Sequence, residues 1–284
     1  MAVEFTKLTP NIGIEAHGID LAEPLGDNVF KSLYDAFATN SVLLIRGQKL
    51  TPDQHVAFAK RFGELDRHVL SENLMSDNPE IFVVSNVKEK GEYVGRAKAG
   101  WFWHSDFSYQ EIPAQASIMH TLECPTAGGD TLFASAGAAF DALSPSMQSF
   151  LEGLTAVHDF ALGSSIVQNR LNKQQMIKQE HFNERPPVSH PVVRVHPDTG
   201  RKTLFVDPGY TDYIEELTRE ESDNLLDYLG RHATQPQFVY RHHWQPGDIL
   251  CWDNRGAWHC AIGDYDDDER RMMHRVTVKG TATT

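Results

Sequence analysis

Residues 190–207 read HPVVRVHPDTGRKTLFVD, and this stretch decides the fold class. Two short apolar runs, rich in valine and leucine, flank the turn sequence HPDTG at 196–200. Proline, aspartate and glycine between two such runs are typical of a β-hairpin, because they supply the backbone angles that a tight turn needs. The stretch therefore predicts a pair of short strands rather than a helix.

Similar short strands recur along the chain, with a few helices between them. Helices are predicted after Asp27 as an N-cap, after Thr51 with Gln54 in a capping box, after Ser144, and after Thr218 with Glu221. The polar stretch 163–187 is expected to be a lid or an insertion. The other predicted strands are SVLLIRG (41–47), IFVVS (81–85), QASIMHTLE (115–123), GDTLFAS (129–135), LTAVHDF (154–160), QFVYRHHW (237–244), DILCWDN (248–254) and RMMHRVTV (271–278). This order indicates one domain over 1–284, mainly β with flanking helices, of the jelly-roll type.

Composition and charge exclude several classes of protein. Hydrophobic residues make up 40% of the chain and charged residues 23%, which is ordinary for a globular domain and excludes a disordered one. The formal net charge of −13 argues against nucleic-acid and anionic-membrane surfaces. No apolar run reaches 18 residues and the first residues do not resemble a secretory signal, so no membrane span is expected. The three cysteines fit a reducing compartment, and we expect a cytoplasmic protein.

The densest signal for a site is Trp103-His104-Ser105-Asp106. On a strand, residues two apart point to the same face, so His104 and Asp106 can present an imidazole and a carboxylate together. Two histidines and one carboxylate form the facial triad that holds Fe(II) and leaves three positions open. His-x-Asp occurs often by chance, so a third ligand must come from elsewhere. His259 is the best candidate, although taken on its own a core histidine between Trp258 and Cys260 is the favoured interpretation of this residue.

Arginines near the end of the chain indicate an anion site. In RRMMHR (270–275), Arg271 and Arg275 share one face of the predicted strand. Two buried guanidinium groups need anionic partners, and arginine binds a carboxylate in a bidentate manner. Arg270 is expected to balance the neighbouring acidic loop at the surface. Thr131, after Gly128-Gly129, offers a hydroxyl, although its segment read alone is only a turn.

Taken in order, these motifs resemble the taurine dioxygenase / 2,4-dichlorophenoxyacetate dioxygenase family of Fe(II)- and 2-oxoglutarate-dependent oxygenases. The resemblance extends from GIEAHGIDLAEPL (13–25) to the last strand, and its motifs are WHSD (103–106), GGDTLFA (128–134), WDNR with His259, and RRMMHR. It implies a distorted double-stranded β-helix of cupin-like form. It also implies that the enzyme uses Fe(II), 2-oxoglutarate and O2 and releases succinate and CO2.

The resemblance also assigns roles to individual residues. His104, Asp106 and His259 match the iron ligands, and Thr131 and Arg271 match the positions that hold the 2-oxoglutarate carboxylate. Arg275 and His68 match substrate-contacting positions, and the aromatic run that begins at Trp101 favours a substrate with apolar bulk. Asn254 or Trp252 is expected to orient His259. A homodimer or homotetramer is expected.

The substrate itself is expected to be a small organic anion other than taurine. Ser71 stands where the taurine enzymes have a tyrosine, and Gly100 where they have an asparagine. Hydroxylation, desaturation and C–S or C–O cleavage all remain open, because the outcome depends on which carbon faces the metal. A metal-dependent hydrolase and a non-catalytic β-barrel binding protein remain as alternatives from other classes.

Overall fold

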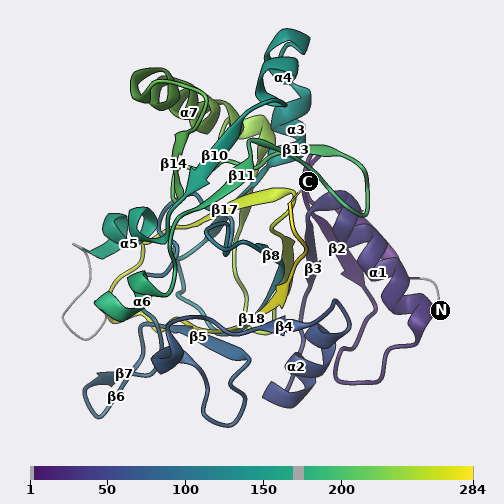
Figure 1. Cartoon of the computed structure of the whole chain (residues 1–284). Coiled ribbons are helices and arrows are strands. Elements are labelled where there is room, and N and C mark those ends of the chain that lie inside the picture. Colours follow the sequence, from purple (N-terminus) through teal and green to yellow (C-terminus); the bar gives the residue numbers. More distant parts are fainter. Residues whose placement is uncertain (1–2, 169–175, 284) are drawn as a thin grey trace.

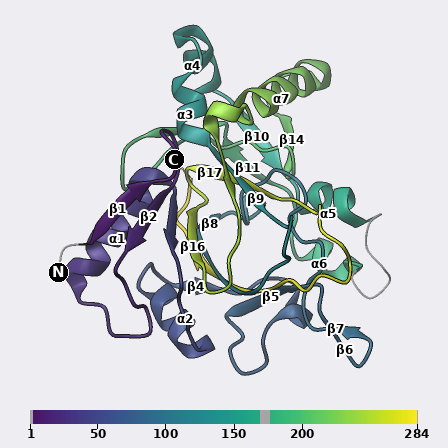
Figure 2. The same cartoon turned by 180° about the vertical axis from the view of Figure 1, so that it is seen from behind.

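The computed structural model describes residues 3–168 and 176–283. Its main layer is an eight-stranded sheet in the order β1-β2-β3-β16-β8-β18-β4, in which β5 also pairs with β18. A smaller sheet, β15-β9-β17, faces it across the core. Two facing sheets made of short, mostly antiparallel strands confirm the predicted mainly β jelly roll. Figures 1 and 2 show α1 and α2 beside the β1–β3 end of the main sheet, with α4 and α7 at the top, near α3, β10 and β14.

The strands and helices have the following bounds. The strands of the main sheet are β1 (Glu4–Lys7), β2 (Ile14–His17), β3 (Val42–Ile45), β4 (Leu65–Asp66), β5 (Ile81–Ser85), β8 (Ala114–Glu123), β16 (Ile249–Asp253) and β18 (Met272–Lys279). The remaining strands are β6 (Lys88–Glu89), β7 (Glu92–Tyr93), β9 (Thr131–Ser135), β10 (Thr155–His158), β11 (Val188–Pro191), β12 (Val193–Val195), β13 (Lys202–Leu204), β14 (Thr211–Ile214), β15 (Val239–His242) and β17 (Ala257–Ala261). The α-helices are α1 (Asp27–Asn40), α2 (Pro52–Lys60), α3 (Ala136–Asp141), α4 (Pro145–Leu151), α5 (Phe160–Gln168), α6 (Gln179–Asn183) and α7 (Arg219–Ala233).

The main sheet is buried on both faces, which explains why its central strands are almost wholly apolar. On one face, Leu33 and Phe37 of α1 and Phe58 of α2 pack against it. On the other face, Phe133 of β9 and Trp252 of β16 belong to the core between the two sheets. All five residues of β16 are buried. A strand covered on both sides reads as a continuous apolar run instead of alternating.

Local sequence signals for turns and caps are mostly reproduced. The 196–200 turn joins β12 to β13 in an antiparallel hairpin, and Thr51 and Thr218 both form capping boxes. The prediction for Asp27 is wrong: the helix is capped by Gly26, without a side-chain hydrogen bond. The Asp27 carboxylate pairs instead with Arg61 at 2.9 Å.

The expected lid at 163–187 is only partly described. Its beginning forms the end of α5 and its later part contains α6, whereas 169–175 lie outside the described residues. Within the part of the chain that the structure describes, no helix is long and apolar enough to cross a membrane.

Candidate active site

Three side chains that are distant in the sequence meet at one buried point. Nε2 of His104 lies 3.7 Å from Oδ1 of Asp106, and Nε2 of His259 lies 3.8 Å from Oδ2 of the same carboxylate. One potential ligand atom from each residue lies within 4.8 Å of the other two, and all three residues are buried. The fold therefore brings together the three residues that the sequence predicted as metal ligands.

Backbone pairing explains why the two imidazoles lie side by side. The N–H of His104 donates to the carbonyl of His259 at 3.0 Å, and the reverse bond measures 2.8 Å. Residues paired in this way point their side chains to the same face, and the ring centroids are 4.1 Å apart. His104 and Asp106 do not lie on a regular strand, because His104 makes an isolated bridge and the chain then turns through Phe107 at φ 58°.

Burial keeps both histidines in the form that binds a metal. It lowers the pKa of His104 and holds the pKa of His259 well below its usual range. Nδ1 of His104 lies 2.8 Å from the carbonyl oxygen of Phe102. Because a carbonyl oxygen only accepts, Nδ1 carries the proton and Nε2 presents its lone pair to the cluster.

Asp106 is held as an ionised carboxylate by a dedicated set of donors. Ser117 on β8 donates its hydroxyl to Oδ2 at 2.6 Å, and Arg275 on β18 donates Nη1–H to Oδ1 at 2.9 Å. Burial alone would raise the pKa of Asp106, but Arg275 and the two imidazoles outweigh it and hold that pKa below its usual range. Two neutral imidazoles and one carboxylate on one side of a buried point fit Fe(II).

Asn254 and Trp252 act on different members of the cluster. The Trp252 ring packs against His259 with centroids 4.8 Å apart, as expected for a residue that orients it. Asn254, in contrast, accepts the backbone N–H of Asp106 through Oδ1 at 3.1 Å and donates to Ser117 Oγ at 3.3 Å. Asn254 thus orients the carboxylate, and the expectation that it orients His259 is wrong.

Arg271 lies buried, only 6% exposed, immediately before β18. Among the described residues, no carboxylate forms an ion pair with its guanidinium, and Nε has no hydrogen-bond partner. Burial lowers its pKa, while Tyr265 and Cys124 nearby act in the opposite direction. A buried guanidinium without an acidic partner fits the carboxylate of a bound anion such as 2-oxoglutarate.

Thr131, the other residue predicted to hold 2-oxoglutarate, borders the same region of the core. Its Oγ accepts the indole N–H of Trp244 at 3.0 Å. The carbonyl of Trp244 lies 3.5 Å from Sγ of Cys124, which is also close enough to Arg271 to affect its pKa. Trp244 and Cys124 therefore link Thr131 to Arg271 through a chain of contacts.

Arg275 and His68, the predicted substrate contacts, line a cavity of about 70 Å³ together with His104 and Asp106. His68 stacks on Phe82 with centroids 4.2 Å apart, and its Nδ1 accepts the backbone N–H of Leu70 at 3.1 Å. The proton of this neutral imidazole is therefore on Nε2, which makes His68 a hydrogen-bond donor. Burial holds its pKa well below the usual range.

Trp101 lies outside this cavity. It lines a neighbouring cavity of about 380 Å³, where its ring packs closely on Gly263 and the ammonium of Lys98 lies 5.5 Å from the ring centroid. Lys98 lines both cavities.

Sequence reasoning missed the aromatic side of the metal cavity. Tyr109 and Tyr210 line it, with ring centroids 4.7 Å apart, and Tyr210 meets His104 edge-on at 5.7 Å. Tyr109 follows Asp106 by three residues and could have been noticed as part of the same turn. Tyr210 has no such signal, because it arrives from the loop after β13.

Comparison with known proteins identifies the family. Residues 4–277 match the family model described as taurine catabolism dioxygenase TauD, TfdA family. The chain is 37% identical to an alpha-ketoglutarate-dependent 2,4-dichlorophenoxyacetate dioxygenase of Cupriavidus pinatubonensis over 98% of each chain. It is 30% identical to an alkylsulfatase of Acinetobacter baylyi, over 99% of this chain and 86% of the relative.

A solved structure agrees with these relatives. AAD-2 in complex with Mn(II) and N-oxalylglycine superposes with a TM-score of 0.83 at 30% identity, over 100% of both chains. The likeness thus covers the fold as well as the sequence. The chain belongs to the TauD, TfdA family and is an Fe(II)- and 2-oxoglutarate-dependent dioxygenase.

Proposed function

We propose that this enzyme oxidises a small anionic organic substrate, with Fe(II) held by His104, Asp106 and His259. The observation that carries the proposal is the convergence of these three buried groups within 4.8 Å, next to the buried Arg275. Bound Fe(II) and 2-oxoglutarate would together supply the oxidising chemistry, with succinate and CO2 as the co-products.

We assign the binding of 2-oxoglutarate to Arg271 and Thr131. The Arg271 guanidinium would form an ion pair with the carboxylate remote from the metal, and the Thr131 hydroxyl would donate a second hydrogen bond. Arg271 is already buried and needs no large rearrangement to meet this anion. Its place immediately before β18 would fix how the co-substrate is oriented.

We assign recognition of the substrate anion to Arg275 and His68. Arg275 uses Nη1 to hold Asp106, while its buried Nε has no partner among the described residues. Nε2–H of His68 offers a second donor in the same cavity. Apolar side chains in the wall, including Phe82 and Phe160, suit the carbon skeleton of the substrate, and Arg96 and Lys98 add two further cations. The relatives named above act on a phenoxyacetate and on alkyl sulfates, which supports an organic anion.

The test is a turnover assay that follows oxygen and succinate together. The protein is supplied with Fe(II), 2-oxoglutarate and air, and is offered aryloxyacetates, alkyl sulfates and alkanesulfonates. We expect at least one of them to stimulate O2 uptake with equimolar succinate. Asp106→Ala should abolish both signals, whereas Asp35→Ala, which removes an exposed carboxylate paired with Lys31, should leave them unchanged.

Two results would overturn the proposal in favour of another class. Release of a hydrolysed product without O2 uptake would indicate a metal-dependent hydrolase. Tight binding of an anion with no succinate from any member of the panel would indicate a binding protein.

We further propose a cytoplasmic location and a homodimer or homotetramer. All three cysteines are free thiols, which supports a reducing compartment. Light scattering of the purified protein tests the assembly, and a monomer at micromolar concentration would refute it.

A further inference from the structure

Asp207, in the loop after β13, has a carboxylate whose hydrogen bonds the active-site assignment does not explain. Its carboxylate is buried and accepts four hydrogen bonds. Oδ2 accepts from the backbone N–H of Ser105 and the hydroxyl of Ser108, both at 3.3 Å. Oδ1 accepts from the backbone N–H groups of Gly209 at 3.0 Å and Tyr210 at 2.8 Å.

The two segments joined by this carboxylate both contribute to the metal cavity. Ser105 stands between His104 and Asp106, so its backbone fixes the spacing of these two residues. Tyr210 lines the cavity and meets His104 edge-on. Ser105 is also held by the β16–β17 turn, where its hydroxyl donates to the carbonyl of Asn254 at 2.7 Å. Asp207 thus anchors the ligand segment together with Asn254 and the His104–His259 backbone pair, and its carboxylate also connects that segment to the loop of Tyr210.

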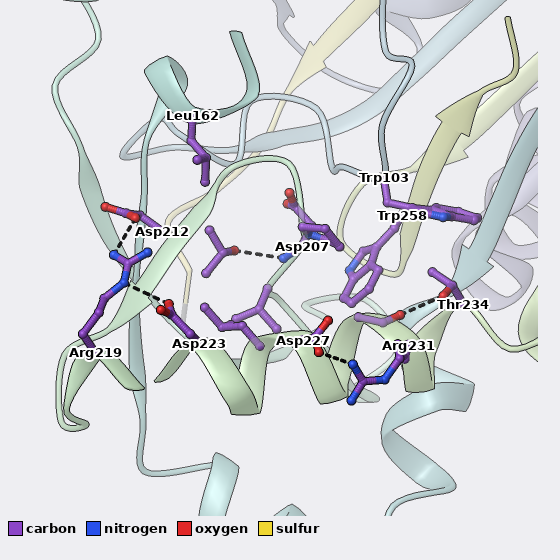
Figure 3. Close-up of a pocket in the computed structure, with 15 residues that line it drawn as sticks. Trp103, Leu162, Asp207, Asp212, Arg219, Asp223, Asp227, Arg231, Thr234 and Trp258 are labelled. Atoms are coloured by element: carbon purple, nitrogen blue, oxygen red, sulfur yellow. Dashed lines mark hydrogen bonds and ion pairs between the residues drawn. The ribbon is translucent and has the colours of Figure 1, made fainter. Parts of the chain in front are cut away.

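Behind the ligand segment lies a cavity of about 400 Å³ (Figure 3). Trp103 and Trp258, the residues that precede His104 and His259, line it together with Asp207. Close packing fixes side chains elsewhere in the core, but a cavity provides no contact atoms on that side. The position of the ligand segment consequently depends more on its hydrogen bonds than on packing from behind.

The four partners of Asp207 are all donors, which explains why a carboxylate is needed. Asparagine would offer one oxygen and would turn an NH2 group towards two of these donors. Among the described residues, no Lys, Arg or His forms an ion pair with Asp207. Burial raises the pKa of Asp207 to about 7, so keeping this carboxylate ionised in the folded protein is costly and would be unusual as a device for stability alone.

We propose that Asp207 is a positioning residue that sets His104 and Asp106 at the spacing required to bind the metal and aligns the Tyr210 side of the cavity with them. This inference rests on the proposed function, because it assumes that His104 and Asp106 are ligands. Residues that orient metal ligands typically change metal affinity by about 10- to 100-fold when they are replaced.

The experiment measures metal binding and does not depend on turnover. The metal-free forms of wild type, Asp207→Ala and Asp207→Asn are titrated with Co(II), followed by the visible absorption of the bound ion. The control is Ser222→Ala on α7, which removes the buried hydroxyl that accepts the N–H of Ile214 of β14 and touches no ligand. Thermal unfolding of each metal-free protein gives the loss of stability.

We expect Asp207→Ala to weaken Co(II) affinity by about 10- to 100-fold, Asp207→Asn to weaken it less, and Ser222→Ala to leave it unchanged. If Asp207→Ala does not fold, Asp207→Asn carries the same test. Wild-type affinity in the Asp207 variants, or an equal loss in Ser222→Ala at similar stability, would overturn the inference. Failure of the proposed function would look different, because wild type itself would then bind Co(II) no better than Asp106→Ala.

Discussion

Replacement of Arg271 by methionine should stabilise the free protein but weaken its binding of 2-oxoglutarate. In the absence of a co-substrate, the guanidinium is buried without an acidic partner among the described residues, and its Nε is unsatisfied. An unsatisfied buried donor costs about 1–3 kcal/mol. Methionine has a similar length and no polar group, so Arg271→Met should stabilise the free protein by up to this amount. For a chain of this size that corresponds to a rise in Tm of about 2–6 °C.

Arg271→Met should, in contrast, weaken the binding of 2-oxoglutarate. Loss of one partner from a buried, hydrogen-bonded ion pair costs about 2–4 kcal/mol, which corresponds to an increase in Kd of about 30- to 700-fold. Titration calorimetry of the Mn(II)-loaded protein measures this Kd. Saturation with ligand at 100 times its Kd stabilises a protein by about 2.7 kcal/mol. 2-Oxoglutarate should therefore raise the Tm of wild type much more than that of the variant.

The neighbouring arginine provides the matched control. Arg270 is exposed and paired with Glu123 at 2.6 Å, so Arg270→Met removes the same charge one residue away from the site. It should change both stability and the Kd for 2-oxoglutarate very little, because exposed ion pairs contribute about 0–1 kcal/mol. An unchanged Kd in Arg271→Met, or a Kd that rises equally in Arg270→Met, would refute the assignment of Arg271.

Two further predictions concern a ligand contact and acid stability. Ser117→Ala removes the 2.6 Å hydrogen bond to Asp106 and should lower kcat/KM by about 10- to 100-fold. Ser32→Ala, on the surface of α1, should leave kcat/KM unchanged. Equal values of kcat/KM in the two variants would contradict this prediction. His158 is fully buried, and its pKa is lowered to about 3 by burial and by His190. The unfolded chain binds a proton below about pH 6.5 and the folded chain does not, so stability should fall by about 2 kcal/mol per such group between pH 7.5 and 5. His158→Phe should lose less stability over this interval in urea unfolding, and an identical loss would show that His158 titrates normally.

Local chemistry accounts for the parts of the fold that the sequence predicted correctly. The Thr51 and Thr218 capping boxes and the 196–200 hairpin depend on residues a few positions apart, so their signals are complete within the segment. Asp27 had the right residue type for a cap, but Arg61, distant in sequence, offered its carboxylate an alternative partner. Tertiary contacts of this kind leave no local pattern.

In the active site, too, some residues could be recognised from the sequence and others only from the contacts that the fold creates. His104, Asp106 and His259 were recognisable because a metal requires those side chains and because their motifs resemble a family. Ser117 and Asp207 were not, since a serine in an apolar strand and an aspartate in a turn are common without a role. Their importance follows only from the atoms that the fold places 2.6 and 3.3 Å away.

The charges gathered at the site limit the substrate further. The whole chain carries −13, yet Arg271 and Arg275 are buried and Asp106 is the carboxylate paired with Arg275. Two further cations, Arg96 and Lys98, also line the cavity, and Glu72 acts on Arg96. Fe(II), Arg271, Arg275 and Asp106 alone sum to about +3, and buried charges require compensation nearby. 2-Oxoglutarate contributes −2, so the site keeps a positive charge that an anionic substrate can offset. An alkyl sulfate should therefore bind more tightly than the neutral alcohol of equal chain length at pH 8, and equal affinity would contradict this account.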